Sequence, residues 1–122
     1  MKKILIIEDD EGVARLLEEE LADEGYRVQR AINGQDALSA CPSFGPDLIT
    51  LDLKMPVMDG IEFLEAYRSE NHRTPIVICT AYPELKQDFK TWASDAYIVK
   101  SGDTHQLKAA IRELLARTTP PA

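Results

Sequence analysis

Hydrophobic residues follow two alternating patterns along the chain. Short apolar runs predict β-strands at residues 2–8, 26–31, 47–52, 75–80 and 96–100. Apolar positions three or four residues apart predict helices around residues 13–21, 37–40, 61–67, 85–92 and 107–115. The runs KILII, DLITL and PIVIC are apolar at consecutive positions, so we expect these strands to be covered on both faces and to lie centrally in a sheet.

Residues that favour turns and helix starts separate these elements. Gly25 follows the first helix, Asn33-Gly34 opens the second, Asp59-Gly60 precedes the third, and Pro83 stands in the first turn of the fourth. The alternation of strands and helices, with short connections, implies right-handed crossovers and a parallel sheet between helices. The sequence therefore predicts a doubly wound α/β fold, with five strands and five flanking helices.

Length and composition fit a single domain over residues 1–122. The chain is 44% hydrophobic and 29% charged, as is ordinary for globular proteins. We expect the core to span about residues 2–116, and residues 117–122 to form a frayed tail because Pro120 and Pro121 end helical structure.

Charge and side-chain chemistry narrow the function classes. The net charge of -7 argues against binding to nucleic acid or to anionic membranes. The longest aliphatic run, ILII, is far too short to span a bilayer. Cys41 and Cys79 lack metal-type spacing, and we expect a reducing, cytoplasmic location. We assign no chemistry to His72 and His105, which stand among polar residues.

Polar residues collect where the predicted strands end. Because the carboxyl ends of parallel strands share one edge, we expect the following groups to converge: Glu8, Asp9, Asp10, Asp52, Thr80 and Lys100. Taken singly, each has a simpler explanation, since Asp9 or Asp10 could cap a helix and Asp52 a turn. Together, Glu8, Asp9 and Asp52 would repel one another unless a divalent cation and Lys100 compensated them. Hard oxygen ligands favour Mg²⁺.

The motifs ILIIEDD, LDLKMPVMDG, ICTAY and YIVKS resemble, in this order, those of the response-regulator receiver domain of two-component signalling. The resemblance covers residues 2 to about 116. It implies a flavodoxin-like sheet with strand order 2-1-3-4-5. It also implies a protein that catalyses only its own phosphorylation and dephosphorylation, and is otherwise no enzyme.

The resemblance assigns roles at the strand ends. It implies that Asp52 is the phosphoacceptor, attacking a phosphoryl group from a histidine kinase, a phosphotransfer protein or a small phosphodonor. Asp9 is then a direct Mg²⁺ ligand, Glu8 a ligand through water, and the main-chain carbonyl of Lys54 a third protein contact. Mg²⁺ and Lys100 would neutralise charge on the transferring phosphoryl oxygens.

The resemblance also implies a switch formed by Thr80 and Tyr97. Movement of Thr80 toward the phosphoryl group would let Tyr97 change the face made by the helix around 85–92, the strand 96–100 and the final helix. We expect this face to meet a downstream protein or output domain, or to form a phosphorylation-dependent dimer. Tyr97 could instead be a buried aromatic without a switching role.

One position near the site departs from the family pattern, and two others are expected to affect the lifetime of the aspartyl phosphate. Ser101 follows Lys100 where a proline after a cis peptide bond is usual, and since a cis bond here costs about 3 kcal/mol, we expect a trans path. We expect Lys54 and Tyr82 to overhang the phosphoryl group and slow its hydrolysis, although both could simply point into solvent.

The same residues argue against two other functions. A haloacid dehalogenase needs a second aspartate two residues after its nucleophile, where this chain has Lys54. An FMN carrier needs a phosphate loop after the first strand, which EDDEG does not supply. A receiver-like protein-binding module that works without phosphorylation remains the alternative.

Overall fold

The structure is a computed structural model that describes residues 1–52, 60–71, 73–80, 95–99 and 104–118. Its strands are β1 (Lys3–Ile7), β2 (Arg27–Ala31), β3 (Leu48–Leu51), β4 (Ile76–Thr80) and β5 (Ala96–Val99). Within the described residues its helices are α1 (Glu11–Asp23), α2 (Gly34–Phe44), α3 (Gly60–Glu70) and α4 (His105–Thr118). The expected helix around 85–92 lies outside the described residues, so α4 corresponds to the fifth expected helix.

The strands form one parallel sheet in the order β2-β1-β3-β4-β5. Every residue of β3 and β4 is buried, and so is every residue of β1 after Lys3, whereas β2 and β5 are partly exposed. The expectation that the three continuous apolar runs form the central strands is therefore confirmed. The strand order that the resemblance implied is confirmed as well.

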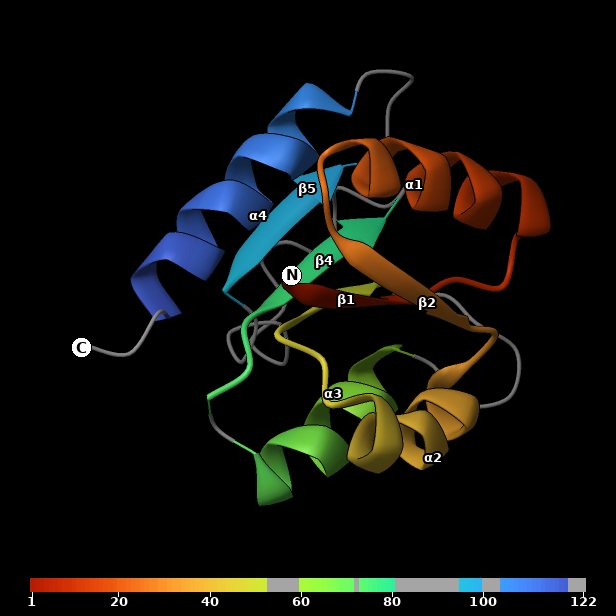
Figure 1. Cartoon of the computed structure of the whole chain (residues 1–122). Helices are drawn as coiled ribbons and strands as arrows, with labels where there is room; N and C mark the ends of the chain where they lie inside the picture. Colours follow the sequence, from red (N-terminus) through yellow and green to blue (C-terminus); the bar gives the residue numbers. More distant parts are fainter. Residues whose placement is uncertain (53–59, 72, 81–94, 100–103, 119–122) are drawn as a thin grey trace.

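The sheet separates two helical layers (Figure 1). Helices α1 and α4 cover one face, and α2 and α3 cover the other. Each layer has its own core cluster: Leu17, Leu21, Ile111 and Leu114 pack on one side with Ile4 and Ile6. Phe63, Leu64, Ala37 and Phe44 pack on the other side with Leu5 and Ile7. Successive β1 residues thus serve opposite layers, as the period of a strand requires.

Short polar side chains begin the first two helices. Asp10 caps α1 by accepting a hydrogen bond from the Val13 amide at 3.0 Å. Asn33 caps α2 by accepting one from the Asp36 amide at 2.8 Å, while the Asp36 carboxylate accepts from the Ile32 amide at 3.0 Å. These two hydrogen bonds explain why Asn33-Gly34 opens the helix, as the sequence predicted.

Helix ends depart from the sequence expectations in two places. Helix α2 continues past Pro42 to Phe44, whose buried ring packs in the core, and then ends at Gly45 with a positive φ of 63°. Helix α4 runs to Thr118, so it includes the first two residues of the segment expected to be frayed. In both places the helix is longer than its apolar pattern indicated.

Two aspartates secure the edge of the sheet where the strands begin, here called the amino edge. The Asp47 amide donates to the Lys3 carbonyl at 2.7 Å, and its carboxylate accepts from the Lys3 amide at 2.7 Å. Asp95 makes the same reciprocal pair with Ile76, with both distances 2.8 Å. The Asp95 carboxylate also accepts from the Arg68 guanidinium at 3.0 Å. Each aspartate thus joins the start of its own strand to that of a neighbour.

Ion pairs connect the first and last helices. Glu20 pairs with Lys108, and Glu24 pairs with Arg112 at 3.1 Å. Glu20 lies in α1 and Glu24 caps its end, while Lys108 and Arg112 both lie in α4, so the partners on each side are four residues apart. The pairs therefore link α1 and α4 beside the core cluster that the two helices share.

Candidate functional site

The opposite edge of the sheet, where the strands end and which is here called the carboxyl edge, carries the acidic residues that the sequence singled out. Glu8 directly follows β1, and Asp52 directly follows β3. These strands are adjacent and parallel, with Ile7 opposite Leu51, and the Asp52 amide donates to the Ile7 carbonyl at 3.2 Å. Register alone therefore places Glu8 and Asp52 side by side.

Three carboxylates converge at this point. One oxygen each from Glu8, Asp9 and Asp52 lies within 4.8 Å of the others. Glu8 and Asp52 are buried, with exposures of 2% and 7%, whereas Asp9 is exposed. The predicted gathering of these three acids is confirmed by the structure, and its exposed member gives the cluster access to solvent.

The acidic residues in the turn between β1 and α1 have two different roles. The Asp10 carboxylate caps α1 and accepts from the Val13 amide. The Asp10 amide donates to the Glu8 carboxylate at 3.1 Å, which orients that side chain. The helix-cap explanation therefore holds for Asp10, and Asp9 is the residue that joins the cluster.

The donor set fits a hard divalent cation. Carboxylate oxygens are the protein ligands that Mg²⁺ prefers, at about 2.0–2.1 Å, so opposite ligands of one octahedral ion lie about 4.2 Å apart. Oxygens within 4.8 Å of one another can reach one ion, directly or with a water bridging one of them. Two positive charges would offset most of the repulsion among three carboxylates.

Thr80 and Tyr97 lie on the neighbouring strands. Thr80 ends β4 with no exposed surface, and Leu51 lies opposite Ile78, so Thr80 stands at the carboxyl edge beside β3. Tyr97 lies opposite Ile78 on β5, is half-buried and packs against the core cluster beneath α2 and α3. Ile78 belongs to the same cluster, so by strand alternation Thr80 and Tyr97 share that side of the sheet.

The remaining expected site residues, Lys54, Tyr82 and Lys100, lie outside the described residues. The peptide bond between Lys100 and Ser101 lies outside them too. Their proposed roles rest on the sequence alone.

Arg30 contacts the acidic turn and was not predicted from the sequence as a site residue. Its Nε donates to the main-chain carbonyl of Glu8 and its Nη2 to that of Asp9, both at 3.0 Å. Arg30 is 22 and 21 residues from these partners and is the second-last residue of β2. The available signal was a cation near the end of the strand that pairs with β1.

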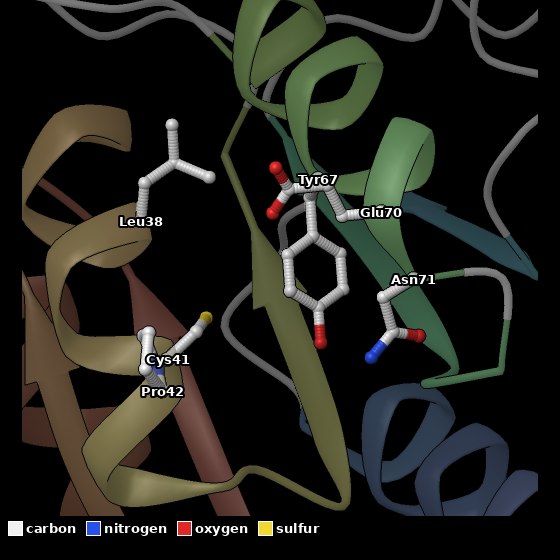
Figure 2. A pocket seen from close by; sticks show the side chains of 6 residues that line it. All are labelled: Leu38, Cys41, Pro42, Tyr67, Glu70 and Asn71. Carbon is white, nitrogen blue, oxygen red and sulfur yellow. The ribbon is translucent and has the colours of Figure 1, made fainter.

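A concave region lies between α2 and α3 (Figure 2). It has a volume of about 240 Å³ and is lined by Leu38, Cys41, Pro42, Tyr67, Glu70 and Asn71. Burial raises the pKa of the Cys41 thiol to about 11, which keeps it protonated and weakly nucleophilic at neutral pH. The Tyr67 hydroxyl donates to Thr74 at 3.0 Å. None of the three converging carboxylates lines this region.

Among the described residues, no helix combines the length and apolar character that crossing a membrane requires.

Comparison with known proteins places these features in a family. The family model for the response regulator receiver domain matches residues 4–112. The chain is 35% identical to the transcriptional regulatory protein PcoR of Escherichia coli over 124 aligned positions, and 41% identical to the response regulator ArlR of Staphylococcus aureus over 119. These alignments cover 100% and 96% of this chain but only 55% and 54% of the relatives, so the chain spans about half their length.

Solved structures agree with the sequence matches. The response regulator TrrA of Thermotoga maritima, in complex with Mg²⁺–BeF, is 38% identical with a TM-score of 0.90, over 93% of this chain and 99% of TrrA. TrrA has also been solved in complex with the histidine kinase ThkA, and that match has a TM-score of 0.88 at 38% identity, over 94% of this chain and 99% of the other. With its sheet order, its convergent acids and the family match over most of its length, this chain belongs to the response regulator receiver domains of two-component signalling.

Proposed function

We propose that this domain is a phosphoacceptor switch in which Asp52 receives a phosphoryl group from a histidine kinase, a phosphotransfer protein or a small phosphodonor. The observation that carries the proposal is the convergence of Glu8, Asp9 and Asp52 at the carboxyl edge. The complexes of the similar protein TrrA with Mg²⁺–BeF and with the histidine kinase ThkA support both the metal and the donor.

The transfer begins with an Asp52 carboxylate oxygen, which attacks the phosphorus atom of a phosphohistidine. A new P–O bond forms as the P–N bond breaks, and the electron pair of that bond returns to the imidazole nitrogen, which takes a proton from solvent. The product is an aspartyl phosphate at the end of β3. Burial of Asp52 limits the number of waters that compete for the phosphoryl group.

Glu8, Asp9 and Asp52 would hold Mg²⁺ beside the transferring group, with the carbonyl of Lys54 as a further contact. The ion supplies neutralisation of negative charge on the phosphoryl oxygens, the main requirement of this reaction. Lys100 is proposed to assist from the end of the last strand.

The signal is proposed to leave the site through Thr80 and Tyr97. A hydrogen bond from the Thr80 hydroxyl to the phosphoryl oxygen would draw Thr80 toward Asp52, and Tyr97 would adjust in the core beside it. The face that includes β5 and α4 would then bind a downstream protein, an output domain or a second copy of the chain. Lys54 and Tyr82 are proposed to lengthen the lifetime of the aspartyl phosphate.

The direct test is the intact mass after incubation with acetyl phosphate and Mg²⁺. We expect the wild-type chain to gain one phosphoryl group and Asp52→Asn to gain none, because an amide is not a nucleophile for this step. Asp23→Asn is the matched control, since it makes the same change at an exposed residue ending α1 and should leave phosphorylation unchanged.

The outcomes separate the two functions considered. Phosphorylation of Asp52→Asn at the wild-type rate and stoichiometry would reject Asp52 as the acceptor. A wild-type chain that gains no phosphoryl mass would favour a module that binds proteins without phosphorylation.

A further inference from the structure

Arg30 links the edge strand to the acidic turn. Its guanidinium donates from Nε to the Glu8 carbonyl and from Nη2 to the Asp9 carbonyl, both at 3.0 Å. The Glu8 amide donates to the carbonyl of Ala31, the next residue of β2, at 3.1 Å. The end of β2 therefore contacts the beginning of the turn at three points.

We propose that Arg30 is a positioning residue that holds the turn between β1 and α1 in the shape that directs the Glu8 and Asp9 carboxylates toward Asp52. The inference rests on the proposed function of that site, and adds to it a residue that does not touch the metal or the phosphoryl group.

The geometry of the guanidinium explains how this can work. A guanidinium is a rigid planar fork, so two of its N–H groups that bond consecutive carbonyls fix both peptide planes relative to each other. The direction of each Cα–Cβ bond follows from those planes, which sets where the side chains of Glu8 and Asp9 start. The ammonium of a lysine is a point donor on a flexible chain and cannot impose the same orientation.

Holding the turn in advance raises the affinity for a cation. If the two peptide planes were free to rotate, binding would have to order them, and that entropy cost would be subtracted from the binding free energy. Arg30 orders them through bonds to the main-chain carbonyls of Glu8 and Asp9, and neither bond is to a carboxylate oxygen.

The charge of Arg30 acts in the opposite direction. A positive group near the acids repels an incoming cation, and so lowers its affinity. The two contributions can be separated, because Arg30→Lys keeps the charge and loses the fork, whereas Arg30→Met loses both. We infer that orientation outweighs repulsion, so that both variants bind Mg²⁺ more weakly than the wild type.

The test is calorimetric titration of Mg²⁺ into the unphosphorylated chain. We expect Arg30→Lys and Arg30→Met each to weaken binding about five- to tenfold, the range for the loss of one hydrogen-bonded constraint. Arg27→Met is the matched control, because Arg27 is the exposed first residue of the same strand and pairs with Lys3, at the end of β2 away from the turn. Circular dichroism at the titration temperature checks that every variant is folded.

Each other outcome overturns the inference. Wild-type affinity in Arg30→Lys would show that the fork is not needed, and tighter binding in Arg30→Met would show that charge repulsion dominates. Equal weakening in Arg27→Met would show that the effect does not depend on the two bonds that Arg30 makes to the turn. Mg²⁺ binding is measured without a phosphodonor, so it does not depend on phosphorylation. A chain that takes up no phosphoryl group would contradict the proposed function, while the Mg²⁺ affinities of the Arg30 variants would still test the role of Arg30.

Discussion

Aspartates occupy both edges of the sheet, but their surroundings differ. At the amino edge, Asp47 and Asp95 stand apart, and each exchanges two hydrogen bonds with the first residue of a neighbouring strand. At the carboxyl edge, Asp9 and Asp52 face each other and Glu8 within 4.8 Å. One residue type therefore joins strands at one edge and builds a charged site at the other.

The difference follows from which main-chain groups each edge presents. At the start of a strand, the amides of Lys3 and Ile76 need acceptors, and a carboxylate can only accept. After β1, the carbonyls of Glu8 and Asp9 need donors, which Arg30 supplies. An acid at the carboxyl edge therefore gains less from the ends of the strands, and a cluster of acids there indicates a ligand with positive charge.

Substitutions at the amino edge should change the stability of the fold most strongly. Asp95→Ala removes the acceptor for the Ile76 amide and for the mostly buried Arg68 guanidinium, so we expect the free energy of unfolding in urea to fall by about 2 kcal/mol. Asp95→Asn, which keeps one oxygen acceptor, should lose less. Mg²⁺ affinity should stay at the wild-type value in both, and a loss of affinity would contradict the separation of the two edges.

Substitutions at the carboxyl edge should change the affinity for Mg²⁺. Asp9→Asn removes one carboxylate of the proposed Mg²⁺ site and should weaken Mg²⁺ binding at least about tenfold, measured by calorimetry. Its stability without metal should be unchanged or higher, because one like charge leaves the cluster. Asp10→Asn makes the same change one residue away while keeping an acceptor for the helix cap, so it should leave Mg²⁺ affinity close to the wild-type value. Equal losses in both variants would remove the distinction between ligand and cap.

The smallest expected effect is a change of stability with pH that comes from Cys41, in the concave region between α2 and α3. Burial raises the pKa of its thiol from 9.0 to about 11, so the folded state holds this proton more tightly than the unfolded state. The resulting stability is complete below pH 9 and is lost as the pH rises toward 11. Alkylation of Cys41 in a Cys79→Ser background should accelerate over the same interval, and a half-maximal rate near pH 9 would contradict the shift.

Much of the fold could be predicted from local patterns. Consecutive apolar residues in β1, β3 and β4 identified the strands that are covered on both faces, because burial on two sides leaves no polar position. The Asn33 cap followed from its side-chain chemistry. The acidic cluster was predictable too, since parallel strands bring their last residues together whatever the details of packing.

Features that depend on pairing between distant segments were not found. The expected strand order places β2 beside β1, but it does not indicate that the Arg30 side chain bonds the carbonyls of Glu8 and Asp9, 22 and 21 residues away. Asp47 was expected only as the first residue of a strand, and its exchange with Lys3 spans 44 residues. Helix α2 extends past Pro42 because Phe44 packs beneath it, a tertiary contact that the spacing of apolar residues up to Ala40 did not reveal.

The division of the core into two layers has a consequence for synthesis on the ribosome. The buried cluster beneath α2 and α3 draws its members from residues 5–78, so it can assemble while the chain is still growing. The cluster beneath α1 and α4 joins Leu17 and Leu21 to Ile111 and Leu114. Among the described residues, α4 is the helix that shares this cluster with α1. A nascent chain stalled before residue 105 lacks α4, so it should present the apolar side of α1 to chaperones.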